Sequence, residues 1–256
     1  MGRARRIAIL SDDHGFQGRV FDLAKPLHLG FESYEQMDAY PDALYVIDVN
    51  WRVELLARRV ESLNRIGDML WTRRLPSPSE RFVLSRYEWL SVITDVFLIR
   101  LISISDCAAL LANAVFQCEI SSRKCTIREL RKSGVSGGVI RAIENLGSGY
   151  QELRKERNRR FHHGVERECS DDSDVFRAIS LLEHRGSGGT FDHRKIKDVD
   201  REYFVGGLEK LKGDFVSAMR ALRPNLRRYY GLLEPEFERR FSRMFQGRTK
   251  PMPWEP

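Results

Sequence analysis

The stretch that most restricts the fold is residues 89–116, WLSVITDVFLIRLISISDCAALLANAVF, which is almost entirely apolar. A membrane-spanning helix needs about 20 mostly apolar residues, and charged side chains inside it are costly. Asp95, Arg100 and Asp106 interrupt this stretch. We therefore predict a central helix, buried on nearly all sides within a helical bundle, in a protein that does not enter a membrane.

Apolar side chains recur at three- and four-residue spacing elsewhere, a pattern typical of helices packed against a core. One such segment begins at Pro41, where proline suits the first helical turn, and runs to about Trp71. Further helices are expected at about 78–117, 127–132, 136–146, 150–163, 173–184, 198–223 and 234–245. No segment shows the alternation of a strand, so the fold class is all-α.

The two ends of the chain differ from this middle part. Residues 1–40 carry Gly15, Gly18, Pro26 and Gly30 without a clean period, and we expect an irregular segment with room for a short strand or helix. Residues 246–256 are rich in proline and predict a flexible tail. The intervening 41–245 is expected to form one helical domain with a loop at about 185–200.

The basic side chains are unevenly divided, with 34 Arg and 9 Lys in 256 residues and a formal net charge of +7. Arginine presents a planar fork of donors that matches two phosphate oxygens, so this excess suits a nucleic-acid partner. The chain also has 36 acidic residues with which arginines can pair, and a GC-rich coding sequence would favour arginine as well. Composition alone leaves these alternatives open.

Metal and cofactor chemistry find no support in the sequence. Cys107, Cys118, Cys125 and Cys169 form no C-x-x-C pair, and we expect free thiols, with Cys107 and Cys118 on one side of the same helix. Phosphate-binding glycine loops and carboxylate clusters are absent, so we predict no metal and no cofactor. The apolar run near the start is too short for a signal peptide, which favours a cytoplasmic location.

The segment whose side chains are best suited to catalysis or binding is QELRKERNRRFHHGVE, residues 151–166. Five of the seven residues from position 154 to position 160 are basic, and two histidines follow: Arg154, Lys155, Arg157, Arg159, Arg160, His162 and His163. A basic run of this kind is often only the solvated face of a helix. Histidine, however, exchanges protons near neutral pH, and arginine stabilises phosphate charge, so the combination also suits phosphodiester cleavage.

Residues Arg157-Asn158-Arg159-Arg160-Phe161-His162 match the R-N-x-x-x-H form of the motif that defines HEPN domains. The segment from Ser105 to Asn113 is similar to a D-x-x-x-x-x-x-N stretch in the core helix of some HEPN subfamilies. In both respects the region of about 41–185 resembles this family.

The resemblance implies an up-and-down helical bundle that forms a homodimer and acts as a metal-independent ribonuclease, in a toxin, phage-defence or RNA-processing setting. By this resemblance His162 would be the acid–base group at the RNA 2′-hydroxyl, Arg157 would hold the scissile phosphate, and Asn158 would orient either of them. Arg154, Lys155, Arg159 and Arg160 would contact RNA. An antitoxin or regulatory protein is a further expected partner.

Several roles stay open at this level. Arg157 and His162 are about 140° apart around a helix, so a joint site needs a second chain or a long reach by Arg157. Asp106 is expected to be a buried ion-pair partner of Arg100 or Arg157, or else to support the site. His163 is either a helix-end residue or a second catalyst.

The sequence departs from one HEPN arrangement. Some HEPN toxins carry a tyrosine two residues after the motif histidine, where a partner enzyme modifies it, and this chain has Gly164 there. A non-catalytic module that binds nucleic acid or protein is the main alternative function. A plain helical scaffold, in which Arg157 and His162 only stabilise the bundle, is a third.

Overall fold

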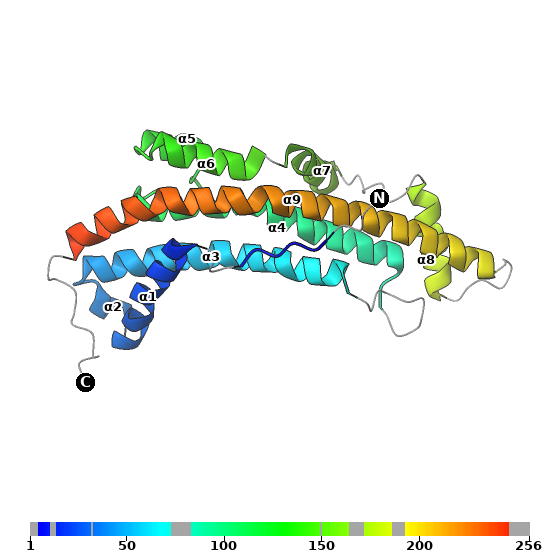
Figure 1. Cartoon of the computed structure of the whole chain (residues 1–256), viewed down its shortest axis with the longest axis horizontal. Coiled ribbons are helices and arrows are strands. Elements are labelled where there is room, and N and C mark those ends of the chain that lie inside the picture. Colours follow the sequence, from blue (N-terminus) through cyan, green and yellow to red (C-terminus); the bar gives the residue numbers. More distant parts are fainter. Residues whose placement is uncertain are drawn as a thin grey trace. The chain divides into compact units, whose positions relative to one another are not determined.

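The computed structural model describes residues 5–10, 14–31, 33–72, 83–148, 150–163, 172–185 and 193–245 of the chain. Within these residues the chain forms helices and no strand, which confirms the all-α prediction (Figure 1). The helices are α1 (Gly15–Gly30), α2 (Tyr34–Met37), α3 (Pro41–Leu70), α4 (Arg86–Val115), α5 (Ile127–Lys132), α6 (Gly137–Ser148), α7 (Gln151–His163), α8 (Ser173–Arg185) and α9 (His193–Met244). None of the described helices is both long enough and apolar enough to cross a membrane.

The chain divides into two compact units, each built from three separate stretches. Unit 1 comprises residues 1–8, 62–101 and 150–220, and so contains all of α7 and α8. In its core the fully buried rings of Phe97 and Phe215 lie 5.7 Å apart, and Trp71 packs on Phe215 at 5.8 Å. The backbone N–H of Tyr87 donates to Ser180 Oγ at 3.0 Å, which ties α8 to α4.

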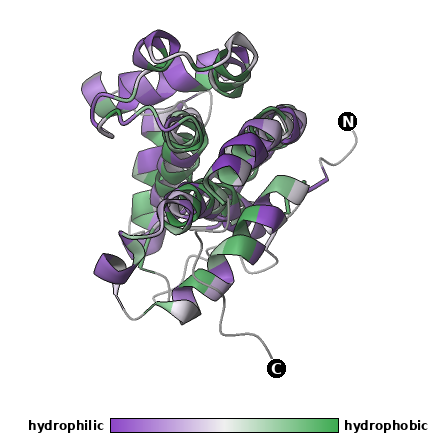
Figure 2. Ribbon diagram, turned by 90° about the vertical axis from the view of Figure 1, so that its left-hand side faces the viewer, coloured by the Kyte–Doolittle hydropathy of each residue, from purple (hydrophilic) through white to green (hydrophobic). Residues whose placement is uncertain are grey.

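Unit 2 comprises residues 9–61, 102–149 and 221–256, and contains α1, α2, α5 and α6. Buried tyrosine hydroxyls link its helices, because Tyr45 donates to the Val115 carbonyl at 2.9 Å and Tyr229 to the Ala108 carbonyl at 2.5 Å. Phe16 of α1 packs edge-on against Phe237 of α9 at 5.6 Å. Several helices carry apolar residues along one side and polar residues along the other (Figure 2).

Most of the middle helices begin and end close to where the sequence pattern predicts. The helix at 127–132 agrees at both ends, and Gly134 after it adopts a φ of 82°, which glycine tolerates without strain. The helix that contains the central apolar stretch starts at Arg86 rather than near 78. The tail 246–256 lies outside the described residues.

The prediction of an irregular N-terminal segment is wrong for residues 15–30, which form α1. The His14 side chain caps this helix by accepting a hydrogen bond from the Phe16 N–H at 3.1 Å. Phe16, Val20, Ala24 and Leu27 are all buried along one side. Burial of this apolar face offsets the helix-weakening glycines and Pro26, which is why local composition misled the prediction.

The two C-terminal helices expected at 198–223 and 234–245 are one helix, α9, which continues through Pro224 and Pro235. Proline removes one backbone hydrogen bond and usually kinks or ends a helix. Both prolines are exposed. The residues on both sides of each proline that face the core are buried, namely Leu222, Leu226, Leu233 and Phe237. Packing of this apolar side outweighs the local cost.

The cysteines only partly follow the prediction. Cys107 is buried in α4, but Cys118 lies beyond the helix end at Val115, so the two do not share a helix. Both are free thiols, as is Cys125, whose pKa burial raises to about 11. Cys169 lies outside the described residues. A raised pKa keeps these groups in the unreactive thiol form at neutral pH.

Candidate functional site

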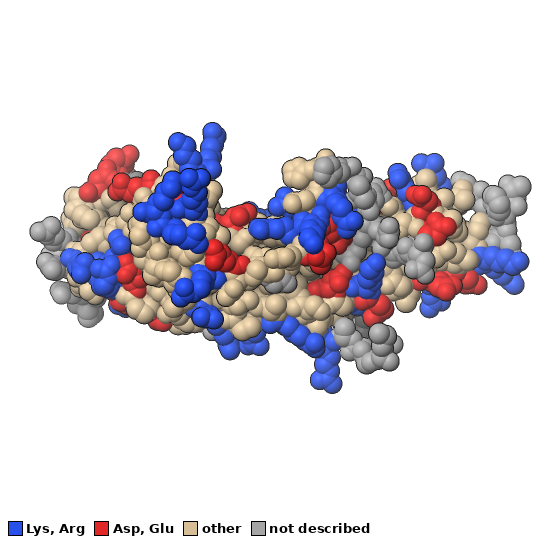
Figure 3. Space-filling model, turned by 90° about the horizontal axis from the view of Figure 1, so that it is seen from above, with Lys and Arg blue, Asp and Glu red and all other residues tan. Residues whose placement is uncertain are grey.

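The basic segment forms α7, a strongly polar helix of unit 1 over which Lys and Arg side chains gather (Figure 3). Glu152 lies in its first turn, where a negative charge is favourable, and pairs with Lys155 at 2.7 Å. Tyr150, directly before the helix, is buried and its hydroxyl donates to the Ala218 carbonyl at 3.3 Å. The start of α7 is therefore fixed to α9.

Arg160 anchors the other end of α7 to α4. Its Nε donates to Asp95 Oδ1 at 2.6 Å and its Nη2 donates to Ser91 Oγ at 3.1 Å. The Arg160 side chain is only 7% exposed. Because its guanidinium group is already bonded to Asp95 and Ser91, Arg160 is not available to bind phosphate.

The two sides of α7 differ in exposure. The half-buried side carries Leu153, Glu156, Arg157 and Arg160. The exposed side carries Arg154, Lys155, Asn158, Arg159 and His162. Asn158 and His162 are four residues apart and thus project from the same side of the helix. Arg157 projects about 140° away from His162, so α7 alone does not bring the two together.

Of the residues expected to support the site, Asp106 and Arg100 lie on α4 rather than on α7. Asp106 is exposed on α4, so the expectation that it is buried is wrong, although it does interact with another residue. Arg100 is half-buried and also has an interaction partner. Arg100 and Arg157 belong to unit 1, whereas Asp106 belongs to unit 2. His163 ends α7, and its side chain lies outside the described residues.

A groove between α4 and α8 was not predicted from the sequence. Its volume is about 360 Å³, and Ser91, Glu88, Arg177 and Arg185 are among its lining residues. Ser91 is also the hydroxyl that accepts from Arg160, so the groove adjoins the anchor of α7. Hydrogen bonds from the Ser85 N–H and hydroxyl lower the pKa of Glu88, which holds this carboxylate at the start of α4.

Arg177 and Arg185 bring two exposed cations to this groove. They lie eight positions apart on an amphipathic helix, a spacing that places the two side chains about 80° apart around the helix axis, so that both can face the same groove. That spacing was the available signal in the sequence, but it is common on solvated helices and has no motif around it.

An exposed apolar surface also adjoins α7, contrary to the prediction that the central helix is buried on nearly all sides. Val92, Val96 and Ile99 follow one side of α4 and, with Phe161 of α7, are between 38% and 47% exposed. Asp95, which holds Arg160, lies within one turn of all three α4 residues. We call these four apolar residues the α4–α7 apolar surface.

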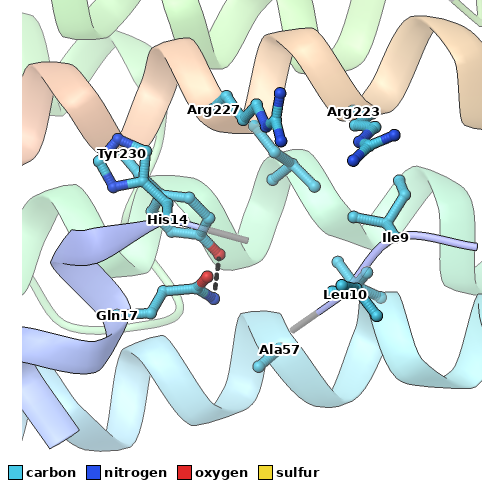
Figure 4. A pocket seen from close by; sticks show the side chains of 10 residues that line it. Ile9, Leu10, His14, Gln17, Ala57, Arg223, Arg227 and Tyr230 are labelled. Atoms are coloured by element: carbon cyan, nitrogen blue, oxygen red, sulfur yellow. Dashed lines mark hydrogen bonds between the residues drawn. The ribbon is translucent and has the colours of Figure 1, made fainter. Parts of the chain in front are cut away.

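A small cavity in unit 2, lined by both polar and apolar residues, is a weaker candidate (Figure 4). His14, Gln17, Arg223, Arg227 and Tyr230 help to line it, and Gln17 Nε2 donates to the Tyr230 hydroxyl at 3.1 Å. Its volume of about 10 Å³ is that of a single water molecule. Its residues therefore connect α1 to α9 rather than admit a ligand.

Metal-binding geometry is not found in the described part of the chain, where no group of three His, Cys, Asp or Glu side chains is arranged to hold an ion. Comparisons of the whole chain with protein-family models, curated proteins and solved structures find no match.

Proposed function

We propose that the protein is a HEPN-type endoribonuclease that cleaves RNA without a metal ion. The observation that carries the proposal is that α7 presents Asn158 and His162 on one solvent-facing side, next to the α4–α7 apolar surface. A proton-transfer group and a polar side chain that can orient it are thus open to a substrate. Residues 157–162 resemble the HEPN motif, and the proposed reaction is the one that this resemblance implies.

The chemistry assigned to these residues is attack by the RNA's own 2′-oxygen on the adjacent phosphorus. His162 accepts the 2′-hydroxyl proton as the new P–O bond forms. The 5′-oxygen of the next nucleotide leaves and takes a proton from water, and the products are a 2′,3′-cyclic phosphate and a 5′-hydroxyl. The Arg157 guanidinium stabilises the charge that builds on the phosphate oxygens.

Water supplies the proton to the leaving 5′-oxygen, and the position of Arg157 requires a second copy of the chain. Arg157 and His162 lie on different sides of α7, but a two-fold axis beside the helix would place His162 near Arg157 of the partner subunit. The α4–α7 apolar surface supplies a contact on which such a dimer would form, because exposed apolar clusters favour association. We therefore propose a homodimer with its site between two α7 helices.

The groove between α4 and α8 extends the proposed RNA path beyond α7. Arg177 and Arg185 can hold phosphates of nucleotides that flank the cleaved bond. With Arg154 and Arg159 on the exposed side of α7, they form a set of cations that a single strand can follow. The partner protein implied by the resemblance stays a prediction.

Purified protein incubated with single-stranded and hairpin RNA in EDTA tests the proposal. We expect cleavage with 2′,3′-cyclic phosphate ends, reduced at least about 100-fold in His162→Ala and in Arg157→Ala, since acid–base catalysis contributes this much. His28→Ala, an exposed histidine on α1, is the matched control and should cleave like the wild type. Undiminished cleavage by His162→Ala would falsify the mechanism.

Mixing the two inactive variants tests whether the site spans two chains. If His162 acts with Arg157 of the partner subunit, a mixed dimer of His162→Ala and Arg157→Ala contains one intact pair, and cleavage returns after subunit exchange. If both residues act within one chain, every site keeps a defect and cleavage stays absent. RNA binding without cleavage by the wild type would instead favour the non-catalytic module.

A further inference from the structure

Unit 2 contains an apolar cavity that the proposed ribonuclease does not use. It has a volume of about 200 Å³, and its apolar lining residues are Leu23 and Leu27 of α1, Ala43 and Val46 of α3, Phe241 of α9 and Phe245, directly after α9. Phe245 is half exposed, whereas Leu27, Ala43 and Val46 are buried. Apolar cavities of about 150 Å³ are known to bind molecules the size of benzene.

One carboxylate, that of Asp42, lies in the wall of this cavity. Asp42 has no exposed surface, and neither of its carboxylate oxygens has a hydrogen-bond partner in the structure. Every other described residue that lines the cavity is apolar, so none of these residues supplies a counter-charge. A buried carboxylate without a partner is costly, and natural proteins rarely keep one without a compensating group.

The position of Asp42 indicates which kind of ligand group would compensate its carboxylate. Asp42 lies in the first turn of α3, where the helix dipole favours the ionised form. An ionised carboxylate at this point accepts hydrogen bonds and attracts positive charge, so an ammonium group complements it better than a neutral hydroxyl does. The surrounding leucine, valine and phenylalanine side chains complement an apolar body attached to that ammonium group.

We propose that this cavity binds a small primary amine with an apolar body, whose ammonium group pairs with Asp42. The ammonium group donates to the two unpartnered carboxylate oxygens, and the body lies among Leu27, Val46 and Phe241. The half-exposed Phe245 marks the side from which the ligand enters.

Two ligands of nearly the same size distinguish the charge from the apolar body. Isothermal titration calorimetry of the full chain is carried out with 2-phenylethylamine and with 2-phenylethanol. We expect the wild type to bind the amine at least about tenfold more tightly than the alcohol, because only the amine compensates the carboxylate. Equal affinity for the two ligands, or no heat with the amine at millimolar concentration, overturns the proposal.

Variants then assign the preference to Asp42. Asp42→Asn removes the charge at nearly constant volume and should abolish the preference for the amine, while the affinity for the alcohol changes little. Asp48→Asn removes an exposed carboxylate from the same helix and should leave both affinities unchanged. An amine preference that survives in Asp42→Asn contradicts the assignment. Should this variant fail to fold by circular dichroism, the comparison of the two ligands on the wild type still decides the outcome.

Discussion

Arg160 shows how a single position in a basic run can differ in role from its neighbours. It lies between Arg159, which is exposed, and Phe161. The sequence alone does not distinguish the roles of Arg159 and Arg160. In the structure Arg160 is 7% exposed and bound to Asp95 and Ser91. Its role is therefore to hold α7 against α4.

Arg160→Ala is expected to destabilise unit 1 by about 1–3 kcal/mol, because Asp95 and Ser91 would lose a charged hydrogen-bond partner. Urea unfolding and hydrogen exchange of the α7 amides measure the effect. Arg159→Ala is the matched control and should change stability by less than about 0.5 kcal/mol, as exposed substitutions usually do. Equal effects of the two variants would contradict the anchoring role.

Asp42 links one residue to pH-dependent stability. Burial raises its pKa above the ordinary value of 3.8, and the backbone N–H groups of Ala43 and of Asp42 itself, which lie near the carboxylate without hydrogen-bonding to it, lower the pKa by a smaller amount. Between the ordinary and the raised pKa the folded chain holds a proton that the unfolded chain has released. The contribution of Asp42 to stability therefore falls as pH rises through this window.

Asp42→Asn should consequently gain stability over the wild type as pH rises from 3.5 to 7, because it removes the cost of ionising a buried, unpartnered group. Denaturant unfolding of both proteins across this pH range, without an amine ligand, provides the test. If the two proteins differ in free energy of unfolding by the same amount at every pH, Asp42 does not titrate differently in the folded and unfolded states.

At the scale of the elements, close packing of two helices depends on a missing side chain. A Cβ placed on Gly67 of α3 would lie 2.9 Å from Cζ of Phe215 on α9. Phe215 cannot move away easily, because it is fully buried and packed by Trp71 and Phe97. The approach of α3 to α9 within unit 1 therefore requires glycine at position 67.

Gly67→Ala is expected to lower stability by about 1–3 kcal/mol through overpacking, although alanine is the better helix former. Gly206→Ala on α9 is the matched comparison, since no atom lies within 4 Å of the added Cβ. It should raise stability by about 0.5–1 kcal/mol, the usual difference in helix propensity. Thermal unfolding monitored by circular dichroism distinguishes the opposite signs, and a gain in both variants would exclude the steric explanation.

At the scale of the whole molecule, the proposed activity depends on association. Val96 lies in the middle of the exposed apolar side of α4, directly after Asp95 and about one turn before Ile99. Introducing a charge there would leave that charge desolvated in a dimer but hydrated in a monomer.

Val96→Asp should convert a dimer to a monomer in analytical ultracentrifugation and lower RNA cleavage at least about 100-fold, because Arg157 of the partner subunit no longer stabilises the phosphate charge. Val83→Asp changes a valine that is 91% exposed and outside this surface, and should leave both properties unchanged. A wild-type chain that cleaves RNA as a monomer would remove the need for a two-chain site.

Helices were predictable where apolar spacing and local breaks agreed. The segments at 41–70, 127–132 and 151–163 follow from periodicity, a proline in the first turn and glycines between helices. The segment of α1 and the continuity of α9 were not predictable, because Gly15, Pro26, Pro224 and Pro235 are unfavourable locally and are offset only by burial against other helices.

The order of residues along the chain was sufficient to predict the all-α class and to place residues 157–162 on one polar helix. Three findings required the folded structure: Arg160 is an anchor, part of α4 is exposed, and Asp42 lies in an apolar cavity. Burial and hydrogen bonding depend on residues far away in the sequence, and a local pattern does not specify which side of a helix those residues cover.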